Sequence, residues 1–240
     1  MRRSLIYVLP LVAPLQADPL INSWLTELSG RYARIYRDNA DQAANAPVTT
    51  WSRGAGVQTL PTYAGVHEIS ATANNLYVRS TGLGFHIMGP WHGATGALFS
   101  NYPANNSHVF RFPRMPNTSI SPKSPTNLGS VGLFVDGVSM FDSRDAFSYD
   151  NSAGQDEQPN SGANIDGDDI WNRDAFVNES ITFDPAFAHQ AGNNHHYHAN
   201  PPGLRHLLGD SVDYDASTNS YTENFNGNHS PILGLSLIHI

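Results

Sequence analysis

The histidines near the end of the chain are the residues best suited to chemistry. Of the eleven histidines, six fall in residues 189–229, and three of these belong to the run His195-His196-Tyr197-His198. If the run is a strand, its period of two places His196 and His198 on one face and His195 and Tyr197 on the other. Two neutral imidazoles side by side provide half of a metal site. The run therefore predicts a metal-binding face.

A complete metal site needs further ligands from other segments. The nearby candidates are Asp184, His189, His206, Asp210 and His229. We predict that His196 and His198 share one cavity with His229 and with either His189 or Asp184, and that His195 has a structural role. Imidazole and carboxylate ligands without sulfur favour Zn(II), Cu(II) or Mn(II). The alternative is a polar seam, in which these side chains only hydrogen-bond inside the protein.

Short strands are the elements that must position these residues. Alternating apolar runs, separated by Gly, Asn and Pro, are typical of a β-rich domain. We predict a mainly β, single sandwich-like β-rich domain with short helices and long polar loops. Strands are expected at residues 66–69, 76–79, 85–88 and 108–112, and a hairpin at 131–141 with its turn at Asp136-Gly137. Helices are expected at residues 18–30 and just after Pro202. Polar loops are expected at residues 113–128 and 149–167.

Four other histidines, His67, His86, His92 and His108, stand singly among the predicted strands. A single histidine in a strand is more often a hydrogen-bonded or solvent-facing residue than a ligand. We therefore expect these four to have structural roles.

Both ends of the chain differ from the domain between them. Two arginines followed by a short apolar run over residues 4–17 predict a signal peptide at residues 1–17, cleaved after Ala17. The run is too short to span a bilayer. Residues 235–240 look like translated sequencing adapter, so we expect a non-native tail after a C-terminally truncated domain at residues 18–234.

Composition excludes several classes of function. The formal charge is −8, and removal of Arg2 and Arg3 with the signal peptide makes it −10. So acidic a protein is not expected to bind nucleic acid, which needs clustered Lys and Arg. The chain has no cysteine, which excludes thiolate metal sites and a lipidated cysteine anchor. It also lacks a phosphate-binding Gly loop, so no nucleotide cofactor is expected. We predict a secreted or periplasmic protein without a membrane span.

The histidine run also carries a resemblance to a known family. His196, Tyr197 and His198 match the last three positions of the Tyr-His-Tyr-His motif of the YHYH family, and His195 stands where that motif has tyrosine. The His-Ser-Pro-Ile of residues 229–232 resembles a second family motif. Further similar segments are residues 89–91, 112–116, 135–138, 145–149 and 183–185, so that the resemblance covers most of the chain after the signal peptide. The resemblance implies no particular activity.

Three functions remain open from the sequence. The first is an exported protein that binds a divalent metal through the histidine cluster. The second is a non-catalytic cell-surface module that binds a glycan or a protein. The third is a metal-dependent hydrolase, in which a metal-bound water attacks an ester, amide or glycosidic bond. For that enzyme the candidate general acids or bases are Asp136, Asp145, Asp174 and Glu179.

Overall fold

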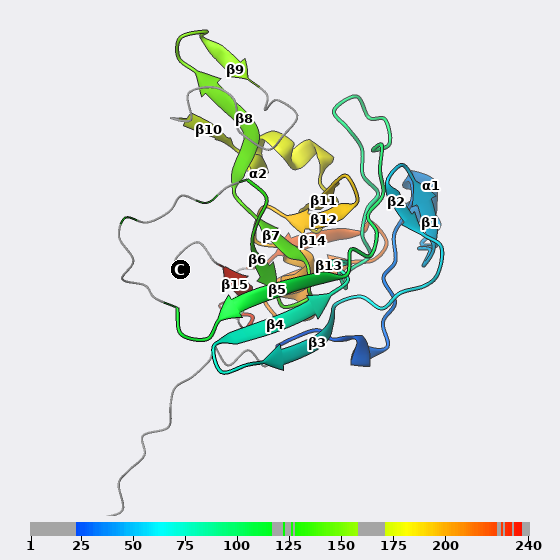
Figure 1. The fold of residues 1–240 in the computed structure, drawn as a ribbon. Helices are drawn as coiled ribbons and strands as arrows, with labels where there is room; N and C mark the ends of the chain where they lie inside the picture. The colour runs from blue at the N-terminus through cyan, green and yellow to red at the C-terminus, as the bar shows by residue number, and fades with distance from the viewer. Residues whose placement is uncertain are drawn as a thin grey trace, which may run out of the picture.

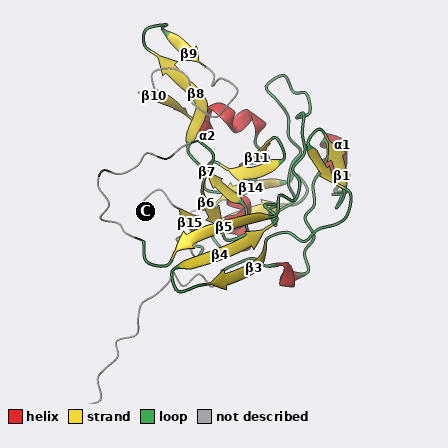
Figure 2. Cartoon of the chain, viewed as in Figure 1, coloured by secondary structure: helices red, strands yellow, loops and turns green. Residues whose placement is uncertain are grey.

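The chain folds into several small sheets connected by long loops (Figure 1). The computed structural model describes residues 23–116, 122, 126, 128–157, 171–224, 227, 229–231 and 233–236. Strands predominate and the helices are few and short, which confirms the mainly β prediction (Figure 2). No helix in these residues is long and apolar enough to cross a membrane.

A five-stranded sheet forms the centre of the domain. Its strand order is β11-β12-β7-β6-β15, and all neighbours are antiparallel except the parallel pair β12 and β7. The strands are β6 (Ser130–Phe134), β7 (Ser139–Phe141), β11 (Ala188–Ala191), β12 (Asn194–Tyr197) and β15 (Gly234–Ser236). The predicted hairpin is confirmed as β6 and β7, although residues 135–138 form a longer connection than two residues, with Gly137 at φ 80°.

A second, antiparallel sheet packs against the central one. Its strands are β3 (Val66–Ala71), β4 (Asn75–Ser80) and β5 (His108–Pro113). Val66, Val78 and Phe112 from this sheet share a buried cluster with Leu133 of β6. Apolar side chains from two sheets thus meet face to face, as in a sandwich. These three strands confirm the predictions for residues 66–69, 76–79 and 108–112.

The remaining strands form smaller units. The strands β8 (Arg144–Asp150), β9 (Gln155–Glu157) and β10 (Trp171–Asp174) project at the top of Figure 1. Two hairpins lie elsewhere, β1 (Trp51–Arg53) with β2 (Gly56–Gln58), and β13 (Val212–Asp215) with β14 (Ser220–Glu223).

The strand expected at residues 85–88 is wrong. Met88 makes only an isolated bridge with Ile35. Phe85, His86 and Met88 are all buried. The alternation of polar and apolar residues there comes from His86, whose side chain pairs with Asp184 inside the protein rather than facing solvent.

The helix expected at residues 18–30 is also wrong over its described part. Leu25 donates its N–H to Val135 O at 2.9 Å and accepts from Val66 N–H at 2.9 Å, so its backbone is extended between two other segments. Only the 3₁₀ turn η1 (Glu27–Ser29) follows, and it ends at Gly30 with φ 71°. Leu28 within this turn is 90% exposed. Tertiary backbone hydrogen bonds have overridden local helix propensity.

The short helix after Pro202 is confirmed as α3 (Pro202–Leu207), with Pro202 in its first turn and Leu204 buried. The other helices are α1 (Asn39–Ala43), α2 (Ala175–Glu179) and the 3₁₀ helix η2 (Ser180–Thr182). Asp174 caps α2 by accepting from Val177 N–H at 3.2 Å. In the chain, α2 and η2 come directly before β11, which pairs with β12. They therefore place polar residues of their own close to the histidines of β12.

Candidate metal centre

The histidine run lies on β12, in the interior of the central sheet. His196 faces His189 of β11 across the antiparallel pair and Ser139 of β7 across the parallel pair. His198 follows one residue after the strand ends. Side chains alternate along a strand, so His196 and His198 point to the same side. Both also line one cavity, so the structure places them on the same side, as the strand period predicts.

Three histidines meet on this side of the sheet. We call His189, His196 and His198 the three-histidine cluster, because each offers a ring nitrogen and all three atoms lie within 4.8 Å of one another. The Nε2 atoms of His196 and His198 are 3.1 Å apart. Glu179, the last residue of α2, completes the group, since its Oε2 lies 3.2 Å from Nε2 of His189 and 3.3 Å from Nε2 of His198.

The opposite nitrogens of His196 and His198 determine where their protons lie. Nδ1 of His196 is 2.9 Å from the carbonyl oxygen of Asn194, and Nδ1 of His198 is 2.8 Å from that of Asp142. A carbonyl oxygen can only accept a hydrogen bond, so each Nδ1 carries a proton. In a neutral imidazole, Nε2 then holds a lone pair. Both Nε2 lone pairs point into the cluster.

The same reasoning applies to His189. Its Nδ1 lies 2.8 Å from Oγ1 of Thr182. The Thr182 hydroxyl donates its proton to the carbonyl oxygen of Glu179 at 2.7 Å, so its oxygen is available to accept from His189. Nε2 of His189 then faces the Glu179 carboxylate, and in a neutral ring it would carry the lone pair that a metal ion needs. Hydrogen bonds of this kind to the far nitrogen orient histidine ligands in metal sites.

Three imidazoles therefore lie together, and the Glu179 carboxylate lies beside two of them, His189 and His198. Burial lowers the pKa of His196 well below its ordinary value, and His189 and His198 lower it further, so this ring stays neutral. Two ligands held at about 2.0–2.1 Å from a tetrahedral metal are separated by about 3.3 Å. The measured separations of 3.1, 3.2 and 3.3 Å match that spacing.

The cluster opens into a cavity of about 180 Å³. Phe141 of β7 forms one wall and stacks on the His196 ring, with ring centroids 3.7 Å apart and planes 11° from parallel. Arg144 and Gln190 also line the cavity. The stacked ring fixes the orientation of His196, and the cavity gives a small molecule access to the cluster.

Two of the residues predicted from sequence do not join the cluster. The Asp184 carboxylate is buried elsewhere, where Oδ2 accepts from His86 Nε2 at 3.1 Å and Oδ1 accepts from the N–H of Ala186 and Ala188. Burial by itself would raise the pKa of Asp184, but His86 and backbone N–H groups hold it below the ordinary value. His229 is exposed. Neither side chain meets the ligand atoms of His196 and His198.

The opposite face of β12 is buried. Tyr197 is fully buried and its hydroxyl donates to Asp136 Oδ2 at 3.0 Å, with His86 Nδ1 at 3.2 Å. Burial lowers the pKa of His195 to about 3, so this ring is neutral, and neither of its nitrogens has a hydrogen-bond partner in the described part of the chain.

His195, His86 and Asp184 also bring ligand atoms within 4.8 Å of one another. In this second group, however, His86 is already engaged by Asp184 and Tyr197. The three-histidine cluster is the stronger metal candidate, because its three rings bring their Nε2 atoms together beside a carboxylate and open into a cavity.

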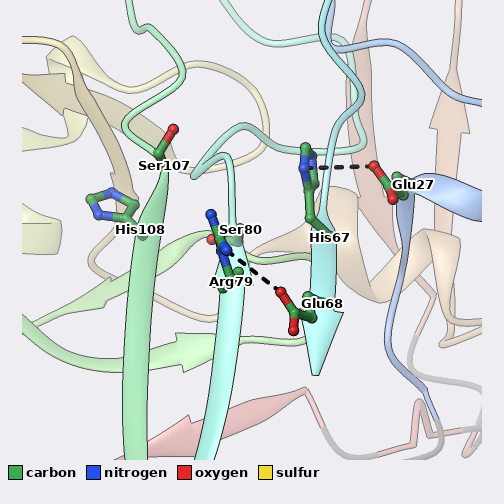
Figure 3. A pocket seen from close by; sticks show the side chains of 7 residues that line it. All are labelled: Glu27, His67, Glu68, Arg79, Ser80, Ser107 and His108. Atoms are coloured by element: carbon green, nitrogen blue, oxygen red, sulfur yellow. Dashed lines mark ion pairs between the residues drawn. The ribbon is translucent and has the colours of Figure 1, made fainter. Parts of the chain in front are cut away.

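The isolated histidines His67 and His108 lie in a different cleft, of about 270 Å³, on the sheet of β3, β4 and β5 (Figure 3). His67 points toward Glu27, and its Nδ1 lies 3.6 Å from that carboxylate. Arg79 and Glu68 form a second pair, also at 3.6 Å. Because these charges are exposed and already paired, the cleft is a weaker candidate than the cluster.

Sequence reasoning treated Glu179 only as a possible acid or base, expected a structural role for His86, and did not identify Thr182. Glu179 and Thr182 belong to the short helices α2 and η2, which were not predicted. The N-cap Asp174 is the one local signal that could have located α2.

Comparison with known proteins bears on the same region. Residues 109–236 match the family described as YHYH protein. This match runs from β5 to β15 and contains all four residues that converge at the centre. No curated protein and no solved structure is detectably similar to the chain. The matched residues make up more than half of the sequence, and the chain belongs to the YHYH protein family.

Proposed function

We propose that this protein binds one divalent metal ion through His189, His196, His198 and Glu179. The observation that carries the proposal is the meeting of three imidazoles within 4.8 Å, with His196 and His198 3.1 Å apart and the Glu179 carboxylate 3.2 Å from His189 and 3.3 Å from His198. Buried lone pairs that face one another without a cation repel, and a metal ion converts that repulsion into four bonds. Three nitrogens and one oxygen favour Zn(II), Cu(II) or Mn(II).

A bound ion would also tie separate elements together. Glu179 ends α2, His189 lies on β11, and His196 and His198 lie on and just after β12. A ligand that binds only the folded state raises the free energy of unfolding by about 2.7 kcal/mol at a hundred-fold excess over its Kd. Removal of the metal should therefore lower the melting temperature.

The competing arrangement replaces the metal by a proton. A second proton on His189 or His198 would allow that ring to donate to Glu179, and the cluster would then be a polar seam. The two arrangements differ in one measurable property, because only the first takes up metal in proportion to protein.

The test compares the full chain, purified without a histidine tag, with its His196→Ala/His198→Ala variant. After chelation, addition of Zn(II) and gel filtration, elemental analysis should find about one zinc per chain in the wild type and far less in the variant. His67→Ala is the matched control, since His67 is exposed and lies on β3. Equal zinc in all three proteins, with melting temperatures unaffected by chelator, would eliminate the proposal.

The cavity beside the cluster favours a second candidate, metal-dependent hydrolysis. A metal ion with an exchangeable position lowers the pKa of its bound water to near 7 and so generates a nucleophile. We expect hydrolysis of p-nitrophenyl acetate to be abolished by chelator and restored by Zn(II). Hydrolysis that is insensitive to chelator, or absent from the zinc-loaded protein, would reject metal-dependent hydrolysis and leave the proposal of metal binding unaffected.

The same proposal includes export. It rests on the arginines and the apolar run of residues 1–17, which lie outside the described residues, and on the absence of cysteine. N-terminal sequencing of the protein recovered from a producing cell should begin at Asp18. An intact Met1 on protein that stays inside the cell would contradict it.

A further inference from the structure

A second cavity, separate from the metal centre, is lined by arginine and tyrosine. It measures about 210 Å³ and lies between the segment of residues 31–36, α3 and the hairpin of β13 and β14. The residues that define it are Arg31, Arg34, His206, Tyr214 and Tyr221. None of these residues coordinates or contacts the proposed metal ion.

The two arginines have no acidic partner in the described part of the chain. The Nε of Arg34 is buried and makes no hydrogen bond there. Among the described residues, the guanidinium of Arg31 donates only to the carbonyl oxygen of Phe85, at 3.2 Å, and lies 5.7 Å from the centre of the Phe85 ring. Burial lowers the pKa of Arg34, and the charge of Arg31 lowers it further. Two neighbouring cations are thus held together against their own repulsion.

This arrangement contrasts with other arginines of the chain. Arg37 forms a bidentate pair with Asp41, and Arg205 binds both Asp210 and Glu223. In a protein with a formal charge of −8, carboxylates are plentiful enough to neutralise exposed arginines. A buried guanidinium nitrogen without an acceptor costs free energy unless a ligand supplies one.

The carboxylates that influence the lining tyrosines are engaged elsewhere. Asp184 accepts from His86 and from backbone N–H groups, and Asp215 accepts from Ser217. Neither forms an ion pair with Arg31 or Arg34 among the described residues. The positive charge of the cavity is therefore available to a ligand.

Aromatic rings form the other side of the cavity. The rings of Tyr214 and Tyr221 lie 4.8 Å apart, and His206 lies 5.9 Å and 6.2 Å from them. Burial raises the pKa of Tyr221 far above its ordinary value, so its hydroxyl remains protonated. That hydroxyl has no hydrogen-bond partner within the described ranges, and Tyr221 lines the cavity.

We propose that this cavity binds a small, ring-bearing carboxylate. The guanidinium groups of Arg34 and Arg31 hold the carboxylate, the Tyr221 hydroxyl donates a hydrogen bond to it, and the rings of Tyr214 and His206 contact the ring of the ligand. The volume of about 210 Å³ limits the ligand to the size of a single sugar acid or aromatic acid. Lysine, which commonly holds phosphate, is not among the described residues that line the cavity.

Matched pairs of acid and neutral analogue test the proposal by calorimetry on the full chain. The probes are galacturonate against galactose, and benzoate against benzyl alcohol, with inorganic phosphate as a third arm. At least one acid should bind at one site per chain, with its neutral analogue about ten-fold weaker or more, because a lost charge-assisted hydrogen bond weakens binding by about that factor. Failure of both acids, or phosphate binding as tightly as either acid, would overturn the proposal.

Variants then locate the site. Arg34→Gln should weaken the acid at least ten-fold, whereas Arg79→Gln, an exposed arginine paired with Glu68 on β4, should leave it unchanged. Tyr221→Phe removes a single hydroxyl and serves if Arg34→Gln does not fold, with several-fold weaker binding expected. If Tyr221→Phe and a folded Arg34→Gln both bind the acid with wild-type affinity, the assignment is refuted. Zinc content is measured in parallel and should not change, so this test and that of the metal centre fail independently.

Discussion

Asp136 provides a quantitative test of the buried network behind the metal centre. The residue is 1% exposed, its Oδ2 accepts from the Tyr197 hydroxyl, and its Oδ1 accepts from Val138 N–H at 3.3 Å. Burial raises the pKa of Asp136 from 3.8 to about 6, against the opposing charge of His86. A rise of about 2 pKa units corresponds to about 3 kcal/mol.

The sign of the effect follows from proton uptake. Because the folded-state pKa exceeds the unfolded one, the folded protein binds more protons between about pH 4 and pH 6. This contribution therefore stabilises the fold at low pH and is lost as the pH rises through 6. Asp136→Asn copies the protonated acid, since its amide can donate to the Tyr197 oxygen while Tyr197 donates to His86.

Urea unfolding of the wild type and of Asp136→Asn, both with chelator, measures the difference in their free energies of unfolding at several pH values. The variant should match the wild type near pH 4 and exceed its free energy of unfolding by up to about 3 kcal/mol at pH 7. Taking the difference between the two proteins cancels the titration of other groups. A difference that stays constant from pH 4 to pH 7 would refute the buried, protonatable carboxyl.

Two further changes separate the opposite faces of β12. Tyr197→Phe leaves Asp136 and His86 each short of one hydrogen bond, so the free energy of unfolding should fall by about 1–3 kcal/mol in urea, with zinc content unchanged. Thr182→Val removes the acceptor that orients the His189 ring, so zinc affinity measured by chelator competition should fall by about 10–100-fold with little loss of stability. Loss of zinc in the first variant, or full affinity in the second, would contradict the assignment of the two faces.

The parts of the fold that sequence predicted are those decided locally. The alternation within residues 66–69, 76–79 and 108–112 is a property of each strand alone, and all three strands are present. The orientation of His196 and His198 is equally local, because a period of two holds whatever strands pair on either side. The Pro202 start of α3 is likewise encoded within one turn.

The parts that failed depend on distant partners. Residues 24–26 are extended because Leu25 bonds to Val135 and Val66, and no local pattern reveals those partners. Glu179 reaches the cluster because α2 packs on β8 and β10 and its last residue contacts His189, which the sequence spacing alone does not determine. The sequence offered His189 or Asp184 as the further ligand beside His196. Only the register of β11 against β12, which pairs His189 with His196, decides between the two.

The most direct test of the metal centre is X-ray absorption at the zinc edge of the zinc-loaded full chain. The chain contains no cysteine, so a sulfur shell cannot confuse the result. The geometry of His189, His196, His198 and Glu179 predicts four light-atom ligands at about 2.0–2.1 Å, three of them with the outer-shell scattering of imidazole. Glu179→Gln should alter the single oxygen ligand and retain the three imidazoles. A six-coordinate shell of oxygen atoms, or a spectrum unchanged in His196→Ala/His198→Ala, would contradict the account.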